Sequence, residues 1–214
     1  MSAVVDMPAN GRVRRLPGPG LMIFIRHGQT DWNAEGRMQG RKDIPLNATG
    51  IDQAIGNGRR LAAFLQREGL SVGDFDFVAS PLDRTRQTMA LVRAQLQLPE
   101  DGYRLDPRLL EITFGDWEGH TLEELALTEP ALVAARARDK WGFTPPNGES
   151  YAMLTGRISN WLTTVSEPSI VVAHGGVFRV MRALLEGLDT TVAPKLDVPQ
   201  DQVFIWRNDE PGWF

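Results

Sequence analysis

The chain has no cysteine among its 214 residues. Disulfide bonds, thiol catalysis and cysteine-based metal sites are therefore excluded, and we predict a cytoplasmic location. No apolar run approaches the roughly 20 residues that a membrane-spanning helix needs, so we expect no membrane partner. Residues 1–20 contain arginines but no apolar stretch behind them, and they do not predict a secretory signal peptide.

An excess of positive charge is also missing, since 23 Lys and Arg stand against 27 Asp and Glu. This balance gives no support to non-specific nucleic-acid binding, and we expect no nucleic-acid partner. It does not exclude an anionic substrate, because a local group of arginines can outweigh the net charge of −4. Histidine is scarce, with three in the chain, so the position of each one is informative.

Short apolar runs alternate with amphipathic helical patterns along the chain. The runs at residues 21–25 and 169–173 are typical of strands that are buried on both faces. Further strands are expected at residues 75–79, 103–105 and 202–206. This alternation predicts an α/β fold with three layers, in which helices cover both faces of a mostly parallel sheet.

The length and the pattern predict one main domain. Proline and glycine recur in residues 1–20, which we predict to be a flexible N-terminal lead-in. Residues 21–214 then form a single domain. Within it, about residues 112–150 are irregular or weakly helical, and we predict that they form a lid that sets substrate specificity.

Polar residues follow the two most apolar strands at the point where each strand ends. Arg26 and His27 come directly after the run at 21–25, and His174 and Gly175 follow the run at 169–173. The carboxyl ends of the strands are where ligands bind in an open α/β sheet. We therefore expect the two histidines to lie at one ligand-binding edge.

Arg84 comes just after the strand at 75–79 and adds a third group to this edge. Ser80 and Pro81 predict the start of a helix there, with Ser80 as its N-cap and Arg84 in its first turn. Guanidinium groups beside helix N-termini suit an oxyanion such as a phosphoryl group. A neutral histidine can attack phosphorus, and nearby arginines favour the neutral ring. A second histidine can donate to a phosphoryl oxygen in the transition state.

Several blocks of the sequence, in this order, resemble the histidine phosphatase superfamily, which is also called phosphoglycerate-mutase-like. The resemblance covers about residues 21–206. Its blocks are residues 26–30 with Trp32 and Asn33, then 37–40, 45–47, 80–88, 110–119 and 173–176.

The resemblance implies a role for each site residue. His27 is expected to be the nucleophile that becomes a phosphohistidine, and Glu111 the proton donor to the leaving oxygen, with His174 as the third catalytic group. The resemblance implies neither a metal nor a cofactor. The expected phosphate pocket consists of Arg26, Asn33, Gln39, Arg84, His174 and Gly175. Gln39 leaves two interpretations open, phosphate contact or stabilisation of its loop.

The number of residues between Glu111 and His174 indicates whether the chain is more similar to the phosphatases or to the mutases of the family. Phosphoglycerate mutases carry a longer insertion there, and the block at 110–119 is more similar to phosphatases. We therefore predict a metal-independent phosphomonoester hydrolase of the histidine acid phosphatase type. Its expected partner is a phosphorylated small molecule, and the protein is expected to be a monomer or homodimer. The alternatives are a cofactor-dependent phosphoglycerate mutase and a non-catalytic phospholigand-binding module.

Overall fold

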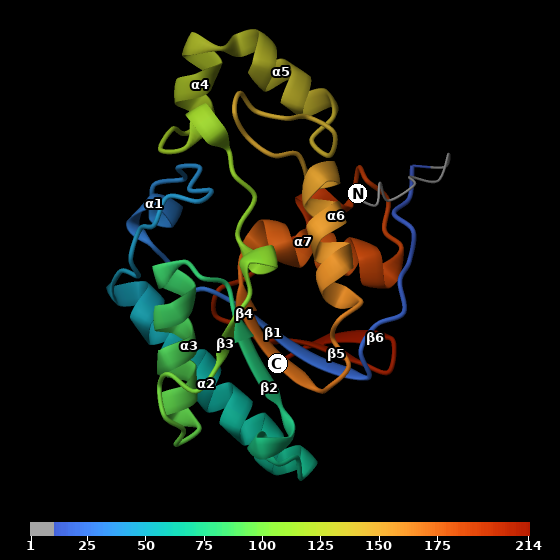
Figure 1. Ribbon diagram of the computed structural model, residues 1–214. Coiled ribbons are helices and arrows are strands. Elements are labelled where there is room, and N and C mark those ends of the chain that lie inside the picture. The colour runs from blue at the N-terminus through green and yellow to red at the C-terminus, as the bar shows by residue number, and fades with distance from the viewer. Residues whose placement is uncertain (1–10) are drawn as a thin grey trace.

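The computed structural model describes residues 11–214 and has a six-stranded sheet at its centre (Figure 1). The strand order is β3-β2-β4-β1-β5-β6, with the first four strands parallel and the last two antiparallel to their neighbours. The predicted mostly parallel α/β sheet is confirmed. The strands are β1 (Leu21–Arg26), β2 (Asp76–Ala79), β3 (Arg104–Leu105), β4 (Ser169–Ala173), β5 (Phe204–Arg207) and β6 (Glu210–Trp213).

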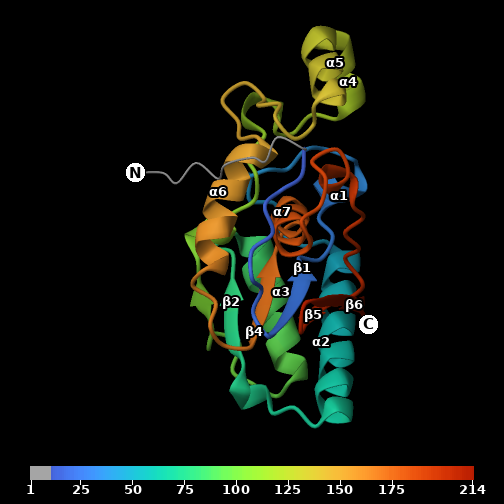
Figure 2. The ribbon, with the colours of Figure 1, turned by 90° about the vertical axis from the view of Figure 1, so that its right-hand side faces the viewer.

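Helices cover both faces of this sheet. On one face lie α2 (Ala48–Glu68) and α3 (Asp83–Gln95), and on the other lie α6 (Tyr151–Leu162) and α7 (Gly175–Glu186). Figure 2 shows α6 and α2 on opposite sides of the strands.

Side chains of β1 alternate between the two cores because successive strand residues point to opposite faces. Met22 and Phe24 pack with the α6–α7 core, whereas Ile23 and Ile25 pack with the α2–α3 core. This burial on both faces explains why the strand is a continuous apolar run.

The remaining helices are short. They are α1 (Asp31–Ala34), α4 (Leu122–Thr128) and α5 (Pro130–Arg138), with 3₁₀ turns η1 (Val72–Asp74), η2 (Pro107–Leu109), η3 (Gly115–Trp117) and η4 (Ala193–Lys195). The loop after β1 therefore contains a helical turn, α1, which the sequence pattern did not predict. Its N-cap is Thr30, in a reciprocal capping box with Asn33.

Helices α4 and α5 project beyond the carboxyl ends of the strands (Figures 1 and 2). They are anchored by a small apolar cluster in which Met38, Trp117 and Leu125 are buried. This projecting segment lies within residues 112–150, and its role as a lid stays a prediction.

The predicted lead-in makes specific contacts in the part that the structure describes. Residues 1–10 lie outside the described residues. Val13 is buried, and its amide donates to the carbonyl of Leu188 at 3.0 Å. The Leu16 amide donates to the carbonyl of Leu184 at 2.8 Å. Residues 13–16 are thus hydrogen-bonded to the end of α7 and the residues after it.

Between residues 11 and 214, no helix combines the length and the apolar character that crossing a bilayer would require.

Candidate active site

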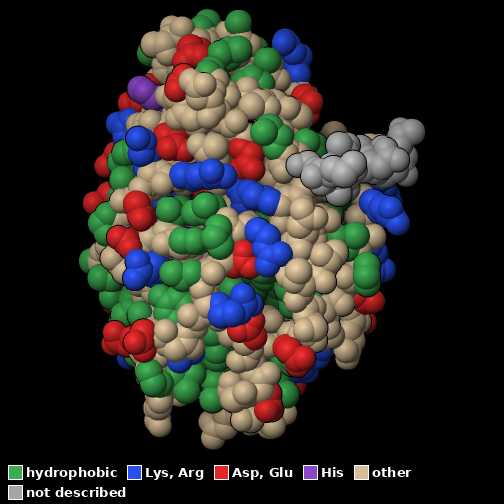
Figure 3. Space-filling model, in the orientation of Figure 1, with side chains coloured by type: hydrophobic (Ala, Val, Ile, Leu, Met, Phe, Trp, Pro, Cys, Tyr) green, Lys and Arg blue, Asp and Glu red, His purple; other side chains and the backbone are tan. Residues whose placement is uncertain are grey.

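The predicted residues converge at the carboxyl edge of the sheet. The rings of His27 and His174 lie edge to face, with their centroids 5.2 Å apart. A cavity of about 350 Å³ opens beside them, and Figure 3 shows Lys and Arg side chains gathered across the middle of this face of the molecule. The cavity is lined by all the predicted residues except the fully buried His174, namely Arg26, His27, Asn33, Gln39, Arg84, Glu111 and Gly175.

The His27 ring is buried and held in one orientation. Its Nδ1 lies 2.8 Å from the carbonyl oxygen of Gly28. A carbonyl can only accept, so Nδ1 carries the proton and Nε2 keeps its lone pair. Burial lowers the pKa of His27 well below its ordinary value, and the charges of Arg84 and Arg26 lower it further. The ring is therefore neutral at pH 7, as a nucleophile must be.

Glycine at position 28 allows this loop to approach α2 closely. A Cβ there would lie 2.2 Å from the carbonyl oxygen of Gly50. A Cβ on Gly50 would in turn lie 2.1 Å from the carbonyl oxygen of Gln29. Only glycine fits at both positions, and the contact fixes the loop that carries His27.

Arg26 and Arg84 bring positive charge to the cavity and are held by backbone carbonyls. Arg26 Nη1 donates to Val198 at 2.7 Å, and the two Nη atoms of Arg84 donate to Lys42 and Gly40, each at 2.7 Å. The Nε atoms of both arginines are buried and have no hydrogen-bond partner among residues 11–214. Unpaired N–H groups at a cavity suit a phosphoryl oxygen.

Both arginines are charged at pH 7 in spite of their burial. Desolvation, with the nearby charge of Arg179, lowers the pKa of Arg26 to about 10. Burial lowers the pKa of Arg84 as well, opposed by the charge of Glu111.

The His174 ring is hydrogen-bonded to Ser80. Its Nε2 lies 2.7 Å from the Ser80 hydroxyl, whereas its Nδ1 is buried without a partner in the described part of the chain. A hydroxyl that donates to Nε2 leaves the ring proton on Nδ1, the atom available to a ligand. Burial, followed by the charge of Arg84, lowers the pKa of His174 well below its ordinary value.

This arrangement corrects the predicted role of Ser80 as a helix N-cap. Helix α3 begins at Asp83, after Leu82, and no side chain of its own N-cap residue caps it. The Asp43 carboxylate, from the loop after β1, accepts from the Asp83 amide instead, at 2.9 and 3.0 Å. Arg84 still lies in the first turn, as predicted.

Glu111 is positioned by backbone amides. Its Oε1 accepts from the Ile112 amide at 2.9 Å, and its Oε2 accepts from the Gly176 amide at 3.1 Å. Gly176 lies in the first turn of α7, which also carries Gly175 into the cavity lining. The Glu111 carboxyl group is thus fixed at the edge of the cavity that His27 lines.

An arginine–glutamate pair supports the backbone at Glu111. Arg157, on α6, donates to the carbonyl oxygens of Leu110 at 2.5 Å and Glu111 at 3.1 Å. It is held in turn by Glu149, whose carboxylate accepts at 2.9 and 3.1 Å. The pair acts on the position of the acid from outside the cavity.

Gln39 forms a hydrogen bond within its own loop and also lines the cavity. Its Oε1 accepts from the Thr30 hydroxyl at 3.1 Å, while its Nε2 is buried with no partner in residues 11–214. Asn33 has its Oδ1 engaged by the Thr30 amide at 3.3 Å and by Gln200 Nε2 at 3.2 Å. The amide nitrogen of Gln39 is therefore able to donate to a ligand in the cavity.

Sequence reasoning missed several residues of this site. Gln200 donates to the His27 carbonyl at 3.0 Å, and Tyr151 and Arg179 line the cavity. Arg179 had a usable signal, because it lies one helical turn after Gly175 on the helix that starts at the site. No sequence pattern connects Gln200 to His27. In the described residues, no cluster of three His, Asp or Glu side chains is placed to hold a metal ion.

Fold and site together describe an α/β protein in which two arginines and a neutral histidine line one cavity at the carboxyl edge of the sheet. In a comparison with known protein families, the histidine phosphatase superfamily (branch 1) matches residues 22–214 of this chain. The chain belongs to this superfamily.

Relatives with assigned names include both phosphatases and mutases. The adenosylcobalamin/alpha-ribazole phosphatase of Escherichia coli is 31% identical over 196 residues, covering 89% of this chain and 86% of the relative. A 2,3-bisphosphoglycerate-dependent phosphoglycerate mutase of Beijerinckia indica is 28% identical over 207 residues, covering 87% and 91%. The crystal structure of the alpha-ribazole phosphatase from Shigella flexneri superimposes with a TM-score of 0.73 at 28% identity, covering 86% and 89%.

Proposed function

We propose that the protein is a metal-independent phosphomonoester hydrolase that works through a phosphohistidine on His27. The observation that carries this proposal is the His27 ring. It is neutral, its Nδ1 is bound to the Gly28 carbonyl, and it lines a cavity with Arg26 and Arg84. The substrate is a phosphorylated small molecule, the kind of ligand that a cavity of about 350 Å³ can hold.

In the first step, His27 Nε2 attacks phosphorus and forms an N–P bond as the bond to the ester oxygen breaks. Protonated Glu111 gives its proton to that oxygen, so the alcohol leaves neutral. Arg26, Arg84 and the Nδ1–H of His174 donate to the phosphoryl oxygens, whose charge is redistributed in the transition state.

In the second step, the Glu111 carboxylate takes a proton from a water molecule. The water oxygen attacks phosphorus, the N–P bond breaks, and the electron pair returns to His27 Nε2. Inorganic phosphate leaves, and both His27 and Glu111 are restored to their starting protonation states.

The acid-phosphatase character of the enzyme is part of this proposal. A histidine nucleophile with an ordinary pKa would be largely protonated at pH 5. The lowered pKa of His27 keeps its Nε2 lone pair available to a lower pH than in an ordinary histidine. Activity is therefore expected to persist in mildly acidic buffer.

The named mutase relative favours a second candidate, a phosphoglycerate mutase. A mutase returns the phosphoryl group to a substrate hydroxyl, so it needs a bisphosphoglycerate primer and gives little free phosphate. A hydrolase transfers the group to water and releases phosphate without a primer.

Phosphate release from a panel of phosphomonoesters in EDTA tests the proposal. The wild type is expected to release phosphate, and His27→Ala to release none. His120→Ala is the matched control, because the side chain of His120 is 54% exposed and pairs with Glu124 outside the cavity. Isomerisation of phosphoglycerate that depends on the primer would favour the mutase. Binding of phosphate esters without turnover would favour the non-catalytic module.

A further inference from the structure

The direction of the His27 ring depends on the peptide groups on both sides of Gly28. His27 Nδ1 is bound to the Gly28 carbonyl at 2.8 Å, so the ring follows the direction of this carbonyl. Glycine allows many backbone conformations because it has no Cβ. The close contact with Gly50 restricts how far the loop can shift, whereas the direction of each carbonyl depends on the rotation of its peptide group. Hydrogen bonds to these peptide groups therefore decide where the nucleophile points.

The peptide group between His27 and Gly28 is held at both ends. Its carbonyl accepts from Gln200 Nε2 at 3.0 Å, and its N–H donates to the hydroxyl of Thr88 at 3.1 Å. The Thr88 hydroxyl gives its own proton to the Arg84 carbonyl at 2.8 Å, so a lone pair of its oxygen is left for Gly28. Because a peptide group is planar, contacts at both ends fix its rotation.

The next peptide group carries the carbonyl that orients the ring. Its carbonyl oxygen, from Gly28, accepts from His27 Nδ1, and its N–H, from Gln29, donates to Gln53 Oε1 at 2.9 Å. Gln53 lies in α2, so a side chain of this helix anchors the peptide group. A rotation that turned the carbonyl away from the ring would also break the hydrogen bond to Gln53, because the group moves as one plane.

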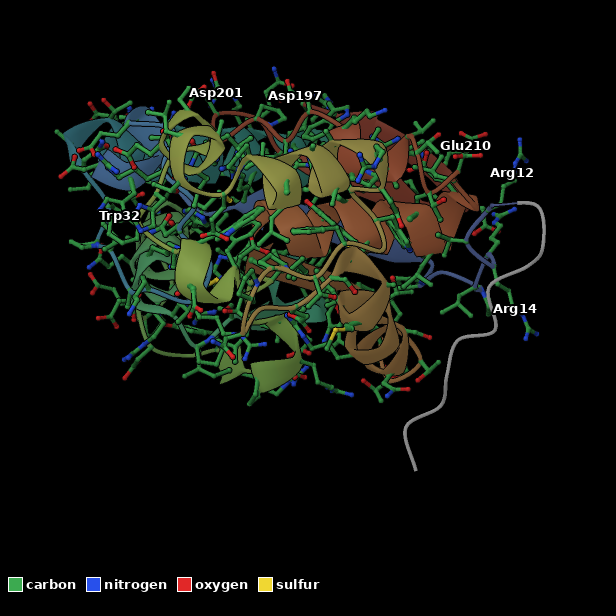
Figure 4. All side chains as sticks on the ribbon, turned by 90° about the horizontal axis from the view of Figure 1, so that it is seen from above. Arg12, Arg14, Trp32, Asp197, Asp201 and Glu210 are labelled. Atoms are coloured by element: carbon green, nitrogen blue, oxygen red, sulfur yellow. The ribbon has the colours of Figure 1, made fainter. Side chains whose placement is uncertain are left out.

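The three side chains come from separate parts of the fold. Gln53 lies in α2, the buried Thr88 in α3, and Gln200 in the loop before β5. This loop is fixed in turn, since the backbone carbonyl of Gln200 accepts from the buried Asn57 at 2.8 Å. Figure 4 shows Asp201 pointing outward at the edge of the molecule, whereas the side chain of Gln200 reaches inward to the nucleophile loop. The three residues are not among those that line the cavity.

We propose that Gln53, Thr88 and Gln200 are positioning residues for the nucleophile. They hold the two peptide groups that direct the His27 Nε2 lone pair into the cavity, and they keep the ring proton on Nδ1 by fixing its acceptor. This inference rests on the proposed function, because it takes His27 as the attacking group. The three residues lie outside the phosphate pocket, so their loss should slow the attack and leave phosphate binding intact.

Thr88→Val is the most selective test, because valine has nearly the same shape as threonine and lacks only the hydroxyl. We expect kcat on nitrophenyl phosphate to fall about 10-fold or more, since a small misplacement of a reacting group is costly. The inhibition constant of inorganic phosphate is expected to stay within about 2-fold, because Arg26 and Arg84 are unchanged.

Conservative and control variants accompany this test. Thr88→Ser keeps the hydroxyl and is expected to keep most of the activity. Thr155→Val is the matched control, because Thr155 is also buried and its hydroxyl also donates to the carbonyl four residues earlier, at 2.8 Å, but in α6. Gln53→Met and Gln200→Met remove the other two contacts and are expected to lower kcat as Thr88→Val does.

The tautomer of His27 gives a readout that does not depend on turnover. The chain has three histidines, so protein labelled with ¹⁵N at histidine gives a simple spectrum of ring nitrogens, in which His27→Ala identifies the His27 signals. The wild-type ring is expected to carry its proton on Nδ1. In Thr88→Val and Gln53→Met we expect a fraction of the rings to carry it on Nε2, because the Gly28 carbonyl is no longer held towards the ring.

The outcomes separate this inference from the proposed function. Wild-type kcat and a wild-type His27 tautomer in Thr88→Val, Gln53→Met and Gln200→Met overturn the positioning role alone. Loss of kcat with an equal loss of phosphate affinity and an unchanged tautomer shows general damage to the protein and also overturns it. If the wild type releases no phosphate from any ester, the proposed function fails, and the tautomer in the variants then decides the positioning role separately.

Discussion

Replacing Arg157 with methionine removes the support of Glu111 without touching the cavity. The guanidinium of Arg157 binds the carbonyl oxygens of Arg108, Leu110 and Glu111 and both carboxylate oxygens of Glu149. Methionine fills much of the same space but donates no hydrogen bond. The change therefore isolates the polar contribution.

The magnitude follows from the burial of the pair. The side chains of Arg157 and Glu149 are 19% and 11% exposed, so removal of the arginine leaves a nearly buried carboxylate whose remaining partner is the more exposed Arg41, 3.5 Å away. Breaking such a pair costs about 3–5 kcal/mol in the free energy of unfolding. The carbonyls of Arg108 and Leu110 also lose their Arg157 donor, and the carbonyl of Glu111 keeps only the hydrogen bond from Arg41 at 3.2 Å. We therefore expect kcat on alkyl phosphates to fall as well.

Urea denaturation of the variant and the wild type measures this loss. Arg104→Met is the control, because the Arg104–Asp76 pair is 56% and 35% exposed and should contribute less than about 1 kcal/mol. Adding Glu149→Gln to Arg157→Met should recover part of the stability, since the buried charge that has lost its nearer partner is gone. A loss in Arg157→Met no larger than in the control would refute the reasoning.

Three other predictions concern the acid, the histidines and the loop contact. Glu111→Gln should reduce kcat at least about 10-fold more on alkyl phosphates than on nitrophenyl phosphate, whose leaving group needs little protonation; equal losses would remove the acid role. Because the folded-state pKa values of His27 and His174 are lowered, the unfolded chain binds more protons below about pH 6.5. Each histidine should thus lower the free energy of unfolding by up to about 1.4 kcal/mol per pH unit as the pH falls towards 5. Urea denaturation that gives the same free energy of unfolding at pH 7 and pH 5 would contradict this prediction. Gly50→Ala would place a Cβ 2.1 Å from a backbone oxygen and should lower the free energy of unfolding by about 1–3 kcal/mol. Gly156→Ala is the control, because the space around Gly156 is open. Equal melting temperatures for these two variants would contradict the prediction.

The positions of the main site residues could be predicted because they follow apolar runs. A parallel sheet buries residues 21–25 and 169–173 on both faces, so the first polar residues after them must lie at the carboxyl edge. The same logic placed Arg84 at that edge. Local pattern was sufficient in these cases because the strand itself positions the residue.

Contacts that depend on distant segments could not be predicted. Ser80 has the chemistry of an N-cap, but the distant Asp43 caps α3, and Ser80 binds His174 instead. Strand β6 has Pro211 and Gly212 in its middle, so its sequence does not favour a strand. It forms because Asn208 and Asp209 adopt left-handed conformations, at φ 51° and 67°, and turn the chain back onto β5.

The most direct test of the account is to trap the phosphoenzyme. Enzyme mixed with a phosphomonoester would be quenched in alkaline denaturant, which preserves phosphohistidine, and the modified peptide located by mass spectrometry. We expect a phosphoryl group on His27 that forms before phosphate release and is absent from His27→Ala. Steady turnover without phosphorylation of His27, or with the phosphoryl group on another residue, would contradict it.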